Sequence, residues 1–255
     1  MSICLKYNSN LFKYKESLKS VLQSYSLQAG HSGNALQGEE TLLPLISGFN
    51  VFTLYYALGE DATYMHLLKD ASMALWKVRE NAERWHIDPE KIAFGGFSAG
   101  GTVAAILGTE WNSTDLGREM DMPYGINKPN ALILGYAPLV FDKKVEKLGK
   151  TNLKPGALIE ENREEINTYR FVGKHTPPSF IWHTYEDTKV PYSNALLFAS
   201  ALNEDGIPFE LHIFQHGEHG LYTATDLTMY GNEIPVNTDS WIDMCSSWLR
   251  KLFDF

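Results

Sequence analysis

Residues 91–105 read KIAFGGFSAGGTVAA, which places a single serine among four glycines and between two apolar runs. Glycine weakens the interior of a strand and is less favourable still inside a helix. Such a cluster is typical of a backbone that turns sharply or approaches another segment closely. The stretch therefore predicts a tight turn centred on Ser98.

This turn has a predicted strand before it, KIAFGG (91–96), and a predicted helix after it, TVAAILGTEW (102–111). The residues from Gly96 to Gly100 then form a G-x-S-x-G motif at the strand-to-helix turn that a nucleophile elbow requires. We interpret Ser98 as a candidate nucleophile. The N–H of Ala99, where the helix begins, is a candidate donor to a developing oxyanion.

Two other glycine motifs do not fit the stretch. A phosphate-binding loop would carry lysine after its last glycine, where this chain has Thr102. A dinucleotide-binding fingerprint would need glycine in place of Phe97. The elbow is the better interpretation, and we expect no nucleotide.

The rest of the chain alternates between predicted strands and helices. The strand segments are short, nearly continuous apolar runs, as in parallel strands buried on both faces; they lie at 20–28, 49–57, 91–96, 130–138, 179–185 and 209–215. The helical segments lie at 66–85, 102–111, 193–206 and 238–253. In 66–85, for example, Leu68, Ala71, Leu75 and Val78 form one apolar stripe. This alternation predicts an α/β fold with a mostly parallel sheet.

Two charged, poorly periodic stretches interrupt the alternation, at 110–129 and 142–177. Long connections of this kind are usually functional loops or caps rather than second domains. We therefore expect residues 1–255 to form one domain, with 142–177 as a cap-like insertion.

A serine hydroxyl needs a base to take its proton, and behind an elbow of this type the acid and the histidine follow the serine in that order. The strand at 179–185 ends in Glu186 and Asp187. Asp187 is the preferred acid because it lies deeper in the turn, and Glu186 is the alternative.

The segment FELHIFQHGEHG (209–220) offers two histidines for the base. His219 is preferred because it lies in the loop beyond the strand and precedes Gly220, where the chain can bend; His216 is the alternative. An H-x-x-H pair also suggests metal. HGEHG, however, is not an H-E-x-x-H motif and no cysteine pair accompanies it, so no metal site is predicted.

The composition narrows the class of protein further. Hydrophobic residues make up 44% of the 255 and the formal net charge is −9, with no lysine or arginine block. Nucleic acid and anionic membrane are therefore not expected as partners. Cys4 and Cys245 are too few for a disulfide framework. The first residues lack the apolar core of a signal peptide, and this favours a cytoplasmic location.

Taken together, DPEKIAFGGFSAGG, TPPSFIWHTYEDTKVP and PFELHIFQHGEHG resemble the α/β-hydrolase superfamily, most closely the esterase/lipase group with acetyl-xylan-esterase-like and sugar-ester hydrolases. The resemblance runs from about residue 49 to the C-terminus. It implies a mostly parallel central sheet with helices on both faces and a cap between strands 6 and 7. It also implies that Ser98, Asp187 and His219 are nucleophile, acid and base of ester hydrolysis through an acyl-enzyme, without a cofactor.

The N-terminal part departs from the family pattern. Relatives supply half of the oxyanion hole from a glycine-rich loop, and here the corresponding stretch reads QAGHSGNALQGEE. One register makes Gly30 and His31 the donors, and another uses His31 to Gly33. Only about 19 residues precede the first expected central strand, so the first two antiparallel strands of the fold should be abbreviated.

The leading hypothesis is an esterase that removes small acyl groups from a polar substrate, such as an acetylated sugar. The charged cap suits a polar substrate better than a lipid. The alternatives are a serine peptidase of the prolyl-oligopeptidase type and a non-catalytic binding protein, the second favoured by the altered loop. The expected binding partner is a small-molecule ester, and a homodimer is one of the assemblies that we consider.

Overall fold

The computed structural model describes residues 2–7, 49–54, 56, 63–141, 166–222, 224 and 235–254. Its strands are β1 (Ser2–Tyr7), β2 (Phe49–Thr53), β3 (Ile87–Phe97), β4 (Ala131–Gly135), β5 (Ser179–Thr184) and β6 (Phe209–Phe214). Its α-helices are α3 (Tyr64–Glu80), α4 (Ala99–Glu110), α5 (Thr114–Glu119), α8 (Ser193–Glu204) and α10 (Trp241–Leu252). Two 3₁₀ helices, η2 (Thr168–Phe171) and η3 (Thr238–Ser240), complete these elements.

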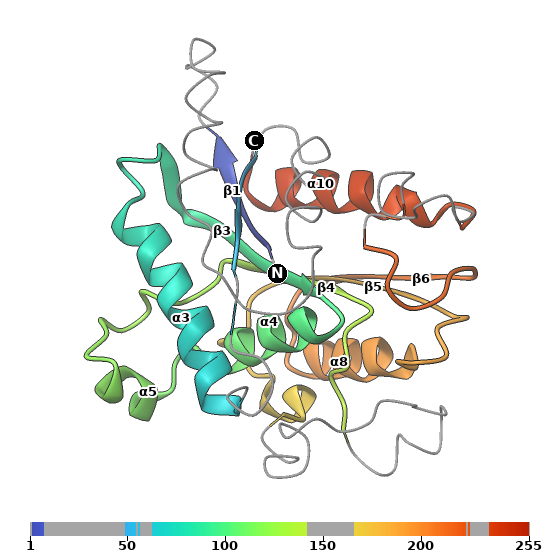
Figure 1. Ribbon diagram of the computed structural model, residues 1–255, viewed down its shortest axis with the longest axis horizontal. Helices are drawn as coiled ribbons and strands as arrows, with labels where there is room; N and C mark the ends of the chain where they lie inside the picture. The colour runs from blue at the N-terminus through green and yellow to red at the C-terminus, as the bar shows by residue number, and fades with distance from the viewer. Residues whose placement is uncertain are drawn as a thin grey trace.

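The strands form one sheet in the order β2-β1-β3-β4-β5-β6 (Figure 1). The ladders from β3 to β6 are parallel, whereas β1 pairs antiparallel with both β2 and β3. Parallel neighbours put their carboxyl ends at the same edge of the sheet, which is where ligands bind in open α/β sheets. The mostly parallel sheet expected from the sequence is confirmed.

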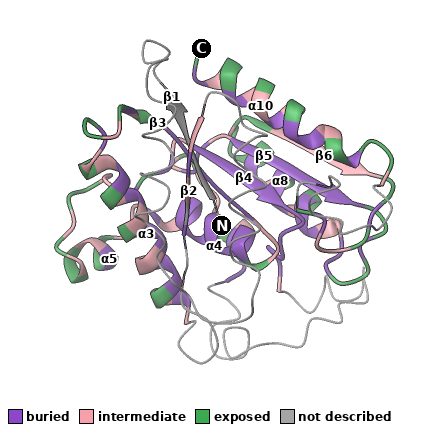
Figure 2. Cartoon of the chain, turned by 45° about the horizontal axis from the view of Figure 1, so that its top comes forward, coloured by how far each residue is buried: buried purple, intermediate pink, exposed green. Residues whose placement is uncertain are grey.

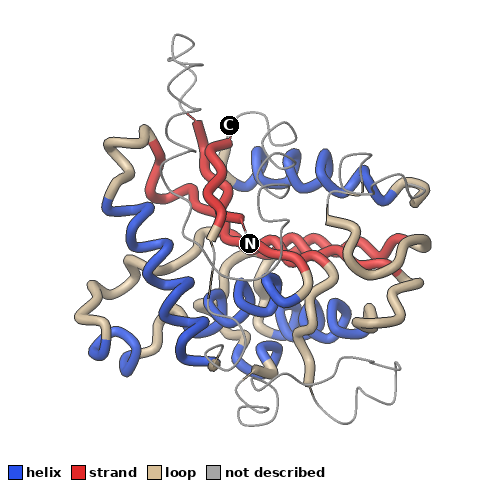
Figure 3. The backbone as a smooth tube through the Cα atoms, in the orientation of Figure 1, coloured by secondary structure: helices blue, strands red, loops and turns tan. Residues whose placement is uncertain are grey.

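Helices cover both faces of this sheet, with α3, α4 and α8 on one side and α10 on the other (Figures 1 and 3). Every residue of β4 and β5 is buried, which explains their nearly continuous apolar sequences (Figure 2). One core cluster packs around α3, α4 and α8, and a second packs under α10. The prediction of helices on both faces of a mostly parallel sheet is confirmed.

The helices form where the apolar stripes and caps indicate. In α3 the predicted stripe of Leu68, Ala71, Leu75 and Val78 is buried, and Thr63 caps the helix by accepting the His66 N–H. Helix α4 lies at the centre of the molecule, with the consecutive residues from Gly100 to Thr109 buried. Among the described residues, no helix is long and apolar enough to cross a lipid bilayer.

Several details differ from the sequence-based expectations. The position beside β3 is taken by β1, which is not among the predicted strands, and the predicted strand at 20–28 lies outside the described residues. A short helix, α5, forms inside the stretch expected to be a loop, because Ser113 caps it and Leu116 is buried beneath it. Of the expected cap, residues 142–165 also lie outside the description.

Candidate active site

Ser98 lies on the turn between β3 and α4, with φ of 50° and ψ of −126°. A non-glycine residue with positive φ carries backbone strain of about 1–3 kcal/mol, so the surrounding structure has to hold it. The Ser98 N–H donates to the Gly135 carbonyl at 3.0 Å, and the Ser98 carbonyl accepts from Gly101 N–H at 2.9 Å. These bonds tie the strained residue to β4 on one side and to the helix on the other.

The glycines around Ser98 are explained by close backbone contacts. A Cβ on Gly96 would lie 2.3 Å from the carbonyl carbon of Gly100, and one on Gly101 would lie 2.4 Å from the Ala137 Cβ. Both distances are far below van der Waals contact. The turn can therefore close this tightly only with glycine at these two positions.

The structure brings three of the predicted residues together at the carboxyl edge of the sheet. Ser98 follows β3, Asp187 follows β5 and His219 lies in the loop after β6. The Ser98 Oγ is 2.7 Å from His219 Nε2, and His219 Nδ1 is 2.7 Å from Asp187 Oδ2. An ionised carboxylate can only accept hydrogen bonds, so Nδ1 carries a proton and Nε2 is left to accept from the serine hydroxyl.

The Asp187 carboxylate is buried and fully satisfied. Its side chain has no exposed surface, and its second oxygen, Oδ1, accepts from the N–H groups of Lys189 and Val190, both at 2.9 Å. Burial by itself raises the pKa of Asp187, but the hydrogen bonds from His219 and Val190 outweigh it and leave the pKa below its ordinary value. Asp187 is thus charged at neutral pH.

The alternative acid and base form a pair of their own. Glu186 Oε1 lies 3.0 Å from His216 Nδ1, and Glu186 Oε2 accepts the Gly217 N–H at 3.1 Å. Both side chains are nearly half exposed. This pair joins the turn after β5 to the loop after β6, and neither residue is bonded to Ser98.

Of the three predicted oxyanion donors, Ala99 lies among the described residues. Ala99 is the first residue of α4 and is exposed, so its N–H belongs to the first turn, which has no intrahelical acceptor. Gly30 and His31, with the alternative register through Gly33, lie outside the described residues.

Two side chains next to this arrangement escaped the sequence analysis. His183, on β5, is fully buried, and burial lowers its pKa to about 4, so it is neutral at pH 7. Tyr136, directly after β4, is buried with its ring against the His219 imidazole. Their positions in the sequence could have marked them as candidates. Both lie at the carboxyl end of a predicted buried strand, and the carboxyl ends of parallel strands meet at the edge where Ser98 lies.

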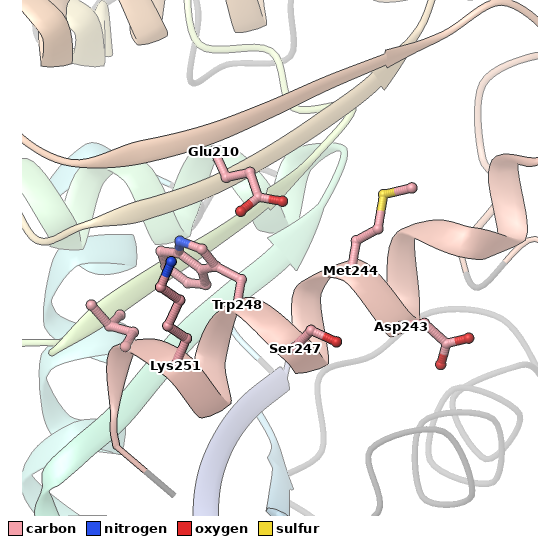
Figure 4. Close-up of a pocket in the computed structure, with 7 residues that line it drawn as sticks. Glu210, Asp243, Met244, Ser247, Trp248 and Lys251 are labelled. Carbon is pink, nitrogen blue, oxygen red and sulfur yellow. The ribbon is translucent and has the colours of Figure 1, made fainter.

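A separate open pocket of about 820 Å³ lies between β6 and α10. Figure 4 shows Glu210 from β6 facing side chains of α10. The lining residues are Glu210, Asp243, Met244, Ser247, Trp248, Lys251 and Leu252. None of these belongs to the Ser98–His219–Asp187 arrangement, so we do not assign the candidate chemistry to this pocket.

Known proteins with related sequences and structures indicate the family to which this chain belongs. The profile of the BD-FAE family matches residues 31–202. The endo-1,4-β-xylanase B of Butyrivibrio fibrisolvens is 32% identical over 184 residues, 70% of this chain and 28% of that protein. The acetylxylan esterase of Xylanibacter ruminicola is 29% identical over 174 residues, 65% of this chain and 33% of that protein.

Among solved structures, the acetyl ester-xyloside bifunctional hydrolase of Caldicellulosiruptor lactoaceticus superposes with a TM-score of 0.65 and 28% identity. That match covers 89% of this chain and 80% of the other. The match to the two curated relatives, by contrast, spans a third or less of their length. The family profile extends over more than half of the sequence and includes both Ser98 and Asp187, and the chain belongs to the BD-FAE family of esterase-like α/β hydrolases.

Proposed function

We propose that this chain is a serine hydrolase that cleaves carboxylic esters of small polar substrates, among them acetylated sugars. The observation that carries the proposal is the 2.7 Å contact between Ser98 Oγ, on the strained turn, and His219 Nε2. In this proposal Ser98 is the nucleophile, His219 the base and Asp187 the acid.

The reaction follows from the hydrogen bonds. His219 Nε2 takes the hydroxyl proton as Ser98 Oγ bonds to the ester carbonyl carbon, and the carbonyl oxygen becomes an oxyanion. When the intermediate collapses, the carbon–oxygen bond to the alcohol breaks and His219 returns the proton to the departing alcohol oxygen. Water then attacks the acyl-enzyme by the same route, releasing the acid and restoring Ser98.

Asp187 and Ala99 have supporting roles in this scheme. The charged carboxylate of Asp187, bonded to Nδ1, fixes the His219 tautomer and stabilises the imidazolium that forms at each proton transfer. The Ala99 N–H, at the N-terminus of α4, donates to the oxyanion, and each such donor is typically worth about 3 kcal/mol of transition-state stabilisation. Gly30 or His31 is our proposed second donor.

The substrate class is supported by the relatives. One is named an acetylxylan esterase and another an acetyl ester-xyloside bifunctional hydrolase, so both names join an acyl ester to a xylose-based sugar. The chain's own negative charge of −9 also suits a neutral sugar better than an anionic lipid or polymer. We therefore place acetylated xylo-oligosaccharides first among the substrates to test.

A direct test measures release of p-nitrophenol from the acetate, butyrate and octanoate esters, and of acetate from acetylated xylo-oligosaccharides. We expect the acetate ester to be the best of the three and the oligosaccharide to be deacetylated. Ser98→Ala should abolish both activities and the covalent labelling by a fluorophosphonate probe, while Ser200→Ala, an exposed serine of α8, serves as the matched control. Labelling that persists in Ser98→Ala would contradict the assignment.

The binding-protein alternative rests on the sequence AGHSGN (29–34), where relatives have a glycine-rich loop. His31→Gly distinguishes the two functions. An inactive wild-type protein that gains turnover from this substitution would favour binding, whereas unchanged activity favours the hydrolase, because backbone donors do not depend on the side chain.

Three organisational points belong to the same proposal. We propose a single domain over residues 1–255 with 142–177 as its cap, a cytoplasmic location, and a homodimer as the assembly to test against a monomer. Limited proteolysis, cell fractionation and light scattering on an eluting size-exclusion peak address these points in turn.

A further inference from the structure

Tyr136 lies at the centre of the carboxyl edge of the sheet, on the strand between those that precede Ser98 and Asp187. It directly follows β4, its side chain is 2% exposed, and its φ is 36°. A bulky residue with positive φ carries backbone strain. Such strain persists only where neighbouring contacts hold the residue in place, and it is most common at functional sites. The Tyr136 N–H donates to the Trp182 carbonyl of β5 at 2.8 Å, which holds the strained backbone in place.

The Tyr136 side chain contacts the His219 loop at two points. Its ring meets the imidazole of His219 edge-to-face, with centroids 5.1 Å apart and planes at 77°. Its hydroxyl oxygen accepts the Tyr222 N–H at 2.9 Å, three residues beyond His219. The same side chain therefore touches the imidazole and holds the backbone that follows it.

Tyr136 is itself rigidly supported. Its ring stacks on Phe97 with centroids 5.7 Å apart and meets Trp182 edge-to-face at 5.1 Å. Burial raises the pKa of Tyr136 well above its ordinary value, so the hydroxyl stays neutral and introduces no charge beside His219.

The His219 loop needs such support because regular secondary structure does not provide it. Between β6 and Tyr222 the backbone takes positive φ at Gly217 (123°), Gly220 (94°) and Tyr222 (51°). On the near side of His219 the loop is held by the bond from Gly217 N–H to Glu186, and on the far side by the bond from Tyr222 N–H to Tyr136. His219 lies between these two points.

We propose that Tyr136 is the positioning residue of His219, fixing the plane of the imidazole and the backbone beyond it so that Nε2 stays placed beside Ser98 for every proton transfer of the reaction. This inference rests on the proposed function. It adds the residue that directly follows β4, a strand whose end contributes no member of the Ser98–His219–Asp187 arrangement. Since Tyr136 acts on the base rather than on substrate binding, its loss lowers kcat and leaves KM unchanged.

Two substitutions separate the ring from the hydroxyl. Tyr136→Phe keeps the ring against His219 and removes the acceptor of the Tyr222 N–H; we expect kcat to fall about tenfold. Tyr136→Leu removes the aromatic contact as well, and we expect about a hundredfold loss, because a small displacement of a reacting group costs that much. In both variants KM should stay within twofold of wild type.

Phe180→Leu is the matched control for stability. Phe180 is fully buried in the same core cluster, and its ring contacts are with His212 and Trp248 rather than with His219. We expect Phe180→Leu to lower the unfolding temperature at least as much as Tyr136→Leu while keeping kcat within threefold. Equal losses of kcat in the two variants would reduce Tyr136 to a core residue and overturn the inference.

Two further readouts do not depend on the ester. The rate of fluorophosphonate labelling at Ser98 should fall in both Tyr136 variants, and the low-field proton resonance of His219 Nδ1–H should broaden through exchange. Labelling rates and resonances that match wild type in folded Tyr136→Leu would contradict the inference. If wild-type protein reacts with the probe but hydrolyses no ester offered, the substrate proposal fails, and the labelling rates still decide the role of Tyr136.

Discussion

Two acid–histidine pairs lie next to each other in the loops after β5 and β6, and they differ in burial and in what else they touch. Asp187 and His219 are 2.7 Å apart, with 0% and 12% of their side chains exposed, and His219 also contacts Ser98. Glu186 and His216 are 3.0 Å apart, with 47% and 46% exposed. An acid–histidine pair at the correct edge of the sheet therefore does not by itself define a site. The buried pair lies against a nucleophile, and the exposed pair joins two loops.

The largest difference should appear between the two histidines. We expect His219→Ala to lower kcat by at least about a thousandfold, because Ser98 loses the base that accepts its proton. His216→Ala should lower kcat by less than tenfold. The measurement is kcat on p-nitrophenyl acetate, and the reverse ranking would mean that the exposed pair is the functional one.

A smaller but still large difference is expected between the two acids. Asp187→Asn keeps the shape of the side chain but reverses the tautomer preference of His219, so kcat should fall at least about a hundredfold. Glu186→Gln should cost less than tenfold, since its oxygen can still accept from the Gly217 N–H. If Glu186→Gln lowers kcat as much as Asp187→Asn does, the contact of Glu186 with the loop after β6 matters as much as the Asp187 charge next to His219.

His183 is a third histidine near this edge; it is buried, and no carboxylate among the described residues is bonded to it. Its pKa is lowered from 6.5 to about 4 by burial. As the pH falls from 7, the unfolded chain binds this proton first, so the free energy of unfolding should decline from about pH 6.5 and level off near pH 4. The full effect is on the order of 3 kcal/mol.

Urea midpoints measured across this pH range test that expectation. His183→Asn should flatten the profile, because the asparagine oxygen can replace Nδ1 as acceptor of the Thr184 N–H without titrating. A wild-type profile that is flat between pH 6.5 and 4 would mean that His183 is protonated in the folded protein.

The smallest effect is expected from salt acting on the exposed pair. Glu186→Gln should lower the unfolding temperature by no more than about 3 °C in dilute buffer, and the difference should shrink in 1 M NaCl because exposed charges are screened. A difference that persists at high salt would show that the exposed charge of Glu186 is not its cause.

Much of the fold could be predicted from local sequence. The apolar runs that become β4 and β5, and the stripe of α3, carry their own periodicity, and the expected bounds differ from the observed ones by a few residues. The strand β1 and helix α5 could not be predicted in the same way. Helix α5 buries Leu116 alone, so it has no apolar stripe of its own. The strand β1 is placed by its antiparallel pairing with β2 and β3, which the order of segments along the chain does not indicate.

The sequence by itself determined the glycine-lined turn around Ser98 and the order of serine, acid and histidine along the chain. Both are local, because a tight turn excludes Cβ atoms and each strand end is visible in the apolar pattern. Only the tertiary structure decided which acid meets which histidine, since Glu186 and Asp187 are adjacent in sequence and folding leaves the first exposed and buries the second. It also decided the position of Tyr136 against His219, a contact between residues 83 positions apart, which follows from the register of parallel strands and not from the residues themselves.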